Sequence, residues 1–200
     1  MREIRILTEQ ELEQAYKDTF TEAFPPEELK PLSAIRDMIA DGIYRALGLF
    51  EGSEPLGYIF LWTGDDPYVL IDYLCVPKHA RNGGIGAELI RRTVESFPKE
   101  TVFIGEVEAP TGDAEADGII LRRLGFYDRC GAIVVGYDNA LFGVHYKTII
   151  WAQKRPSDEE VMAHHDGFYR RRFSPELYAA AVQIPLREGE QPYRRKEWIE

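Results

Sequence analysis

The chain has 200 residues, 44% of them hydrophobic and 29% charged, which is the composition of a soluble globular protein with room for one domain and an appendage. Its formal net charge of −10 argues against a broad nucleic-acid surface, because phosphate backbones bind clustered Lys and Arg. The longest apolar runs end well short of the roughly 20 residues that span a bilayer, so we expect neither a nucleic-acid nor a membrane partner.

The N-terminal residues contain no signal-peptide core, so we expect a cytoplasmic protein. Cys75 and Cys130 lack the spacing of a zinc site or of a small disulfide-bonded protein, which predicts two reduced thiols. His164 and His165 are adjacent, and on a helix their side chains diverge by about 100°. We therefore expect no metal site.

The first half of the chain predicts a strand, two helices and an antiparallel meander. Ile4 and Ile6 alternate with polar residues, and a capping box from Thr8 to Glu11 opens a helix that Pro25 stops. A second apolar stripe follows Pro31. Strand-forming residues separated by turn residues then predict three strands, at residues 44–50, 56–61 and 68–76. Along the third, strict alternation would place Leu70, Asp72, Leu74 and Val76 on one face.

The second half alternates strands with helices. We expect a helix at 84–96, a strand at 101–108, a helix at 113–129, and strands at 132–137 and 144–152. A strand–helix–strand crossover implies a parallel pair of strands. After residue 154 the chain becomes charge-rich, and Ser157 and Ser174 open further helices. We predict a domain at 1–154 and a helical extension at 155–200, packed on the domain or on a second subunit of a homodimer.

A glycine-rich turn with Gly83, Gly84 and Gly86 separates the strand at 68–76 from the next helix. Glycines let a ligand approach the backbone, and the first N–H groups of a helix bind phosphate. A Walker A loop would need Lys and then Ser or Thr after its last glycine, and the chain lacks both there. A nicotinamide-binding fingerprint fits Gly84-Ile85-Gly86, but Leu89 stands where its third glycine belongs.

Residues 73–86 resemble the acyl-coenzyme A loop of the GNAT superfamily of N-acetyltransferases, whose motif is Gln or Arg, x, x, Gly, x, Gly or Ala. Arg81, Gly84 and Gly86 match it. Leu74-Cys75-Val76 resembles the end of the family's preceding strand, and residues 126–131 (FYDRCG) resemble its Phe-Tyr-x-x-x-Gly. The resemblance covers about residues 4–152.

The resemblance implies an α+β fold with a mixed, mostly antiparallel central sheet, helices on both faces and two parallel strands that splay apart. It implies acetyl-coenzyme A as co-substrate, with its pantetheine arm on the backbone of Leu74, Cys75 and Val76. The coenzyme's pyrophosphate is expected on the turn and the first residues of the helix, namely Arg81, Asn82, Gly83, Gly84, Ile85, Gly86 and Ala87.

Acetyl transfer to an amine needs a base for the ammonium, an oxyanion donor and an acid for the departing thiolate. The resemblance assigns the acid to Tyr127, which we also expect to contact the coenzyme. A water-relayed base is predicted at Asp72 or at Glu106, and these two stay open. A backbone N–H near Leu74 or Cys75 is the predicted oxyanion donor.

The predicted activity is acetyl transfer from acetyl-coenzyme A to an amine in a ternary complex. The acceptor is a small-molecule amine or a peptide, and the sequence does not choose between them. Two alternatives stay open: a coenzyme A-binding sensor or interaction module without turnover, and a NAD-dependent oxidoreductase.

Overall fold

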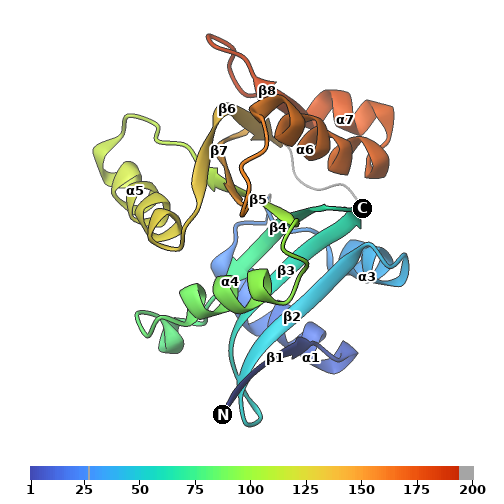
Figure 1. The fold of residues 1–200 in the computed structure, drawn as a ribbon, viewed down its shortest axis with the longest axis vertical. Helices are drawn as coiled ribbons and strands as arrows, with labels where there is room; N and C mark the ends of the chain where they lie inside the picture. Colours follow the sequence, from blue (N-terminus) through green and yellow to red (C-terminus); the bar gives the residue numbers. More distant parts are fainter. Residues whose placement is uncertain (27, 194–200) are drawn as a thin grey trace. The chain divides into compact units, whose positions relative to one another are not determined.

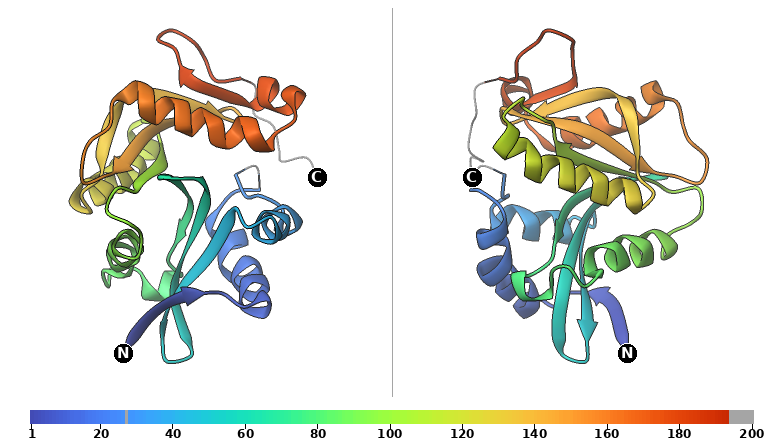
Figure 2. Two further views of the ribbon diagram at one scale, coloured as in Figure 1. Left: turned by 45° about the vertical axis from the view of Figure 1, so that its right-hand side comes forward. Right: turned by 90° about the vertical axis from the view of Figure 1, so that its left-hand side faces the viewer.

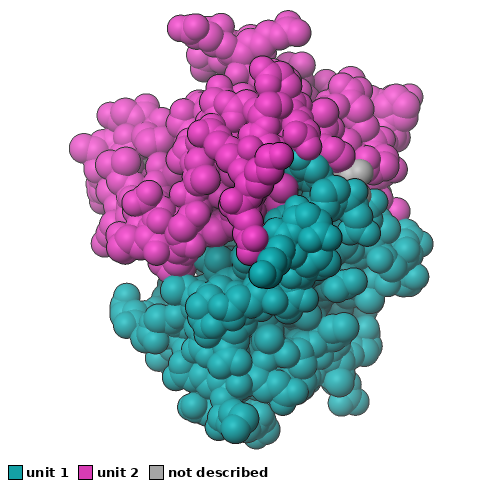
Figure 3. Space-filling view, viewed as in Figure 1, with its two compact units in different colours: residues 1–101, 197–200 teal, residues 102–196 magenta. Residues whose placement is uncertain are grey.

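The computed structural model describes residues 1–26 and 28–193, which divide between Thr101 and Val102 into two compact units (Figure 3). Each unit is an antiparallel sheet with helices on both of its faces. No helix among the described residues is long and apolar enough to cross a bilayer. The chain is a mixed α+β protein with mostly antiparallel strands, as predicted.

The sheet of the first unit is the predicted antiparallel meander. Its strands pair in chain order: β1 (Arg2–Ile6), β2 (Tyr44–Glu51), β3 (Glu54–Asp65) and β4 (Tyr68–Cys75). The expected hairpin turn lies between Glu51 and Glu54, which are partners in the register of β2 and β3. The predicted parallel pair would join β4 of this unit to a strand of the second unit, and it stays a prediction.

The helices of the first unit include the two predicted before the meander. They are α1 (Glu9–Ala15), the π-helical turn η1 (Tyr16–Phe20), α2 (Thr21–Ala23), α3 (Leu32–Ala40), the 3-10 turn η2 (Lys78–Ala80) and α4 (Ile85–Glu95). The capping box from Thr8 to Glu11 is confirmed at the start of α1. The sequence predicts one continuous helix here, whereas the π-helical turn divides it. Figure 2 shows α4 on one face of this sheet and α1 and α3 on the other.

A β-bulge interrupts β4 at Asp72. Phe60 of β3 pairs with Tyr73, while the next residue, Leu61, pairs with Ile71, so Asp72 is the extra residue. A bulge changes which face the following side chains occupy. The strict alternation predicted along this strand is therefore wrong at this point.

The second unit has the strand order β5 (Val102–Glu108), β7 (Val144–Trp151), β6 (Ile133–Leu141) and β8 (Val182–Leu186), all antiparallel. Its helices are α5 (Ala114–Arg129), α6 (Asp158–Arg172) and α7 (Pro175–Ala181). Figure 1 shows α5 and α6 on opposite sides of the strands.

The C-terminal extension is only partly helical. Ser157 and Ser174 cap α6 and α7 as predicted, each accepting a hydrogen bond from a backbone N–H three residues on. Residues 182–186 then form β8, which pairs with β6. Residues 194–200, the end of the predicted extension, lie outside the described residues.

Candidate functional site

The predicted phosphate loop forms an open turn between β4 and α4. Asn82 and Gly84 both adopt left-handed backbone conformations, with φ of 63° and 77°. Gly84 is the N-cap of α4, and no side chain caps this end. A Cβ placed on Gly84 would meet no atom within 4 Å. No side chain therefore satisfies the first N–H groups of α4, and a helix start of this kind can bind an anion.

A glycine in the neighbouring strand allows α4 to lie directly on the sheet. A Cβ on Gly57 of β3 would lie 2.8 Å from Cδ1 of Leu89 and 3.1 Å from Cγ2 of Ile85. Both residues are buried in the contact between the first half of α4 and the sheet. Gly57 therefore helps to position the glycine turn, a role that sequence reasoning missed.

The last two residues of β4 and the residue that follows them, Val76, are the three expected to hold the pantetheine arm. Leu74 and Val76 are half-buried, whereas Cys75 is buried and pairs with Tyr58 of β3. Burial raises the pKa of the Cys75 thiol to about 11, so it stays protonated at neutral pH. The Nε of Arg81 donates to the Val76 carbonyl oxygen over 2.9 Å, which ties the turn to the strand end.

Tyr127 lies in the last turn of α5, and Gly131 determines where that helix ends. Gly131 has φ of 82°, its N–H donates to the Asp128 carbonyl, and the Ala132 N–H donates to the Tyr127 carbonyl. This pair of bonds is the Schellman motif, which needs a left-handed residue at the position that Gly131 occupies. The spacing from Tyr127 to Gly131 thus has a local structural cause.

The ring of Tyr127 packs edge-on against Trp151 of β7, with 5.9 Å between ring centroids. Trp151 Nε1 in turn donates to the Cys130 carbonyl over 3.0 Å, which attaches the end of α5 to the sheet. The Tyr127 hydroxyl has no hydrogen-bond partner among residues 1–26 and 28–193. Desolvation raises the pKa of Tyr127 to about 12, so the phenol keeps its proton at neutral pH.

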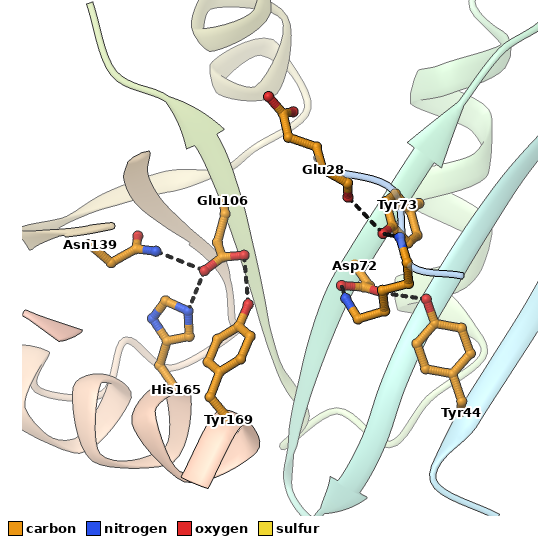
Figure 4. Close-up of polar contacts among 9 residues, drawn as sticks. Glu28, Tyr44, Asp72, Tyr73, Glu106, Asn139, His165 and Tyr169 are labelled. Carbon is orange, nitrogen blue, oxygen red and sulfur yellow. Dashed lines mark hydrogen bonds and ion pairs between the residues drawn. The ribbon is translucent and has the colours of Figure 1, made fainter. Parts of the chain in front are cut away.

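Asp72, at the bulge of β4, is held by a lysine and a tyrosine. Oδ1 lies 2.6 Å from Nζ of Lys30, and both side chains are almost fully buried. Oδ2 accepts a hydrogen bond from the Tyr44 hydroxyl (Figure 4). The Lys30 ammonium also lies near the rings of Trp62 and Tyr73. The Asp72 carboxylate, a predicted base, is thus one half of a buried ion pair.

Glu106, on β5, accepts hydrogen bonds from three side chains. Asn139 Nδ2 donates to Oε1 over 2.8 Å, and the Tyr169 hydroxyl donates to Oε2 over 2.9 Å. Nε2 of His165 lies 2.8 Å from Oε1. Figure 4 shows these three groups converging on the carboxylate. The side chain of Glu106 keeps 12% of its surface exposed.

Comparison with known proteins identifies the family. The model of the acetyltransferase (GNAT) family matches residues 9–132, more than half of the chain. This protein belongs to the GNAT family of acetyltransferases. The predicted resemblance is confirmed, and the match includes the glycine turn and residues 126–131.

Individual GNAT proteins agree with this assignment. YjbC of Bacillus subtilis (strain 168), named as an acetyltransferase, is 26% identical over 152 residues, which are 72% of this chain and 74% of YjbC. A GNAT-family structure from Bacteroides thetaiotaomicron has a TM-score of 0.67 at 20% identity, covering 82% of this chain and 94% of that one. An aminoglycoside 6'-N-acetyltransferase complexed with coenzyme A has a TM-score of 0.57 at 15% identity, covering 78% and 99%.

In this GNAT protein the predicted site residues lie on both units. Asp72 and the glycine turn belong to the first, and Glu106 and Tyr127 belong to the second. Each acid is surrounded by partners that the sequence analysis did not identify. His165 and Tyr169 are four residues apart on α6, a spacing that puts both on one helix face and that was available as a signal. No cluster of three or more potential metal ligands occurs among the described residues.

Proposed function

We propose that this protein transfers the acetyl group of acetyl-coenzyme A to an amine. The observation that carries the proposal is the uncapped start of α4 behind a left-handed glycine turn, in a chain of the GNAT family. In the proposal the pyrophosphate binds to the backbone of the turn and first helical residues, which are Arg81, Asn82, Gly83, Gly84, Ile85, Gly86 and Ala87. The positive end of the α4 dipole favours that charge.

The proposed transfer is direct, within a ternary complex of enzyme, acetyl-coenzyme A and amine. The pantetheine arm pairs with the backbone of Leu74, Cys75 and Val76, as an added strand would. A covalent acyl-enzyme on Cys75 is disfavoured, because its buried thiol has a pKa of about 11 and the nucleophile would be the thiolate. A backbone N–H near Leu74 or Cys75 stabilises the oxyanion.

Tyr127 acts in this proposal as the acid for the departing thiolate. Its hydroxyl has no hydrogen-bond partner among the described residues, and its raised pKa of about 12 keeps the proton on oxygen. A phenol of that pKa is a weak acid toward a thiol of ordinary pKa near 8.5. Tyr127 therefore acts first by donating a hydrogen bond to the departing sulfur, where negative charge develops.

Glu106 is the base that we propose, rather than Asp72. If Asp72 took a proton, its buried ion pair with Lys30 would be lost, which is costly. The donors to Glu106 among the described residues are an amide, a phenol and an imidazole, so no Lys or Arg charge depends on it. Its partial exposure also leaves room for the water that relays the proton.

The remaining assignments belong to the same proposal. Residues 1–154 form the acetyltransferase domain and residues 155–200 an extension of it. The acceptor is a small-molecule amine or a peptide, and the protein acts in the cytoplasm, consistent with two cysteines that form no disulfide. Acetyl-coenzyme A is the co-substrate, with no metal.

Two measurements test the proposed function. Calorimetry with acetyl-coenzyme A and with NAD should show binding of the first at micromolar concentrations and no binding of the second. Thiol release should then rise above the acceptor-free rate with at least one member of a panel of amines and N-terminal peptides. Binding of acetyl-coenzyme A no tighter than millimolar would exclude the activity. Tight binding without transfer to any acceptor would favour a coenzyme A-binding sensor.

A further inference from the structure

The C-terminal extension supplies two of the three donors that hold Glu106. We propose that His165 and Tyr169 are positioning residues of the reaction, which orient the Glu106 carboxylate so that it takes the acceptor's proton through water. This inference rests on the proposed function, in which Glu106 is the base. It makes α6 a part of the active site rather than an appendage to it.

The geometry of the two contacts is specific. Nε2 of His165 lies 2.8 Å from Oε1 of Glu106, and the Tyr169 hydroxyl donates to Oε2 over 2.9 Å. Each donor thus contacts a different carboxylate oxygen, which fixes the plane of the group. The His165 side chain is fully buried, so water does not compete for its bond.

The far side of His165 determines which nitrogen carries the proton. Nδ1 lies 3.1 Å from the Tyr137 hydroxyl of β6. Burial raises the pKa of Tyr137, so its phenol keeps a proton to donate to Nδ1. The imidazole then has its proton on Nε2, directed at Glu106. The contact between Tyr137 and His165 thus makes Nε2 of His165 the nitrogen that donates to the Glu106 carboxylate.

The third donor to the carboxylate is oriented in the same way. The Thr148 hydroxyl of β7 donates to Oδ1 of Asn139 over 2.9 Å, which leaves Nδ2 facing Oε1 of Glu106. A carboxylate has about four lone-pair positions, and the three donors leave one of them for a water molecule. The partly exposed Glu106 carboxylate is therefore fixed in direction and has a position left for one water.

Anchoring α6 does not by itself require these residues. Val161 and Phe168 of the same helix are buried and already supply apolar contact. If packing were their only role, apolar side chains at positions 165 and 169 would extend this apolar contact. They would also avoid the free-energy cost of burying polar groups around a carboxylate. The polar cluster instead converges on one group, Glu106.

The test compares two replacements of His165, with an amine that the unaltered protein acetylates. His165→Leu removes the donor, and kcat should fall about tenfold or more, within the range that a misplaced general base costs, while KM for acetyl-coenzyme A stays within about twofold. His165→Gln can still donate from an amide nitrogen and should recover most of kcat. Tyr169→Phe should lower kcat in the same way as His165→Leu.

The Glu106→Gln background separates a positioning role from a structural one. His165→Leu should reduce kcat no further in Glu106→Gln, because the group that it positions has gone. Multiplicative losses in the double variant would overturn the inference, as would an unchanged kcat in His165→Leu or Glu106→Gln. Val161→Ala, in the same helix, should lower the melting temperature and leave kcat unchanged. A loss of kcat in Val161→Ala as large as in His165→Leu would also overturn it.

The same assays distinguish failure of this inference from failure of the proposed function. If the unaltered protein acetylates no amine on the panel, the proposed function fails and the inference with it. If the unaltered protein is active and the His165→Leu protein is equally active, only the positioning role is overturned.

Discussion

The Lys30 ammonium lies 2.6 Å from Oδ1 of Asp72, and the two side chains expose only 5% and 6% of their surfaces. Lys30 belongs to the segment before α3, and Asp72 is the extra residue of the β4 bulge. Tyr73 of β4 fixes the same segment, because its hydroxyl accepts from the Lys30 N–H and donates to the Glu28 carbonyl. The ion pair therefore attaches a loop to β4, the last strand in the sheet of the first unit.

Lys30→Met should strongly destabilise the protein. It leaves a buried carboxylate without its counter-ion, at a cost of about 3–5 kcal/mol in the free energy of unfolding. Lys30→Met with Asp72→Asn removes both charges and should lose less than the sum of the single changes. Urea denaturation measures all three.

The exposed pair of Lys17 and Glu13 provides the control for this prediction. Its side chains expose 63% and 43% of their surfaces, so Lys17→Met should lower the free energy of unfolding far less than Lys30→Met. Equal losses from Lys17→Met and Lys30→Met would contradict the prediction.

Gly84→Ala should weaken acetyl-coenzyme A binding about tenfold or more. The new methyl group would project into the space proposed for the pyrophosphate, next to the first N–H groups of α4. The left-handed conformation at φ of 77° also costs an L-residue about 1–2 kcal/mol of stability. Calorimetric titration with acetyl-coenzyme A gives the change in Kd.

Gly52→Ala is a matched control, because Gly52 is also left-handed, with φ of 65°, and a Cβ at this position would likewise meet no atom within 4 Å. It lies in the hairpin turn between β2 and β3. The two variants should lose similar stability, whereas Gly52→Ala should bind acetyl-coenzyme A normally. A similar Kd for both would exclude the turn as the pyrophosphate site.

Tyr127→Phe should lower kcat by roughly 10–100-fold, with little change in KM for acetyl-coenzyme A, because the lost proton donor acts on the departing thiolate. Steady-state thiol release measures both constants. Tyr193→Phe, which changes a tyrosine that is 46% exposed, should leave both unchanged. An unaltered kcat in Tyr127→Phe would remove this residue from the mechanism.

Glu11→Gln should make the free energy of unfolding less dependent on pH in the acid range. A side-chain hydrogen bond from Arg5, with help from the Thr8 backbone, lowers the pKa of Glu11 from 4.5 to about 2. A carboxylate whose pKa is lower in the folded than in the unfolded state stabilises the protein fully when the pH is above the unfolded pKa, near 4.5. This stabilisation is lost as the pH falls toward the folded pKa of about 2.

The difference in unfolding free energy between the unaltered protein and Glu11→Gln should therefore be on the order of 1 kcal/mol at about pH 6 and shrink by about pH 2.5. Urea denaturation at both pH values checks this. Glu3→Gln, in the neighbouring strand β1, is the control. A difference that stays constant with pH would show that Glu11 stabilises the helix without its charge.

Much of the fold and the conformation of the glycine turn could be predicted because their causes are local. The capping box at Thr8, the hairpin turn after Glu51 and the Schellman glycine Gly131 each act within about six residues of chain. The turn at Gly84 is likewise specified by its own residues. Backbone conformation over such short spans depends on side-chain size and hydrogen bonding that the sequence displays directly.

Tertiary structure decided the features that join distant segments. The bulge at Asp72, the strand at residues 182–186 and the carboxylate cluster of Glu106 all depend on partners far away in the chain. The alternation of polar and apolar residues does not predict the register between strands, and it does not predict which side chains contact a buried acid. The sequence by itself thus determined the glycine turn that begins α4, whereas packing of α6 against the second sheet decided which side chains surround Glu106.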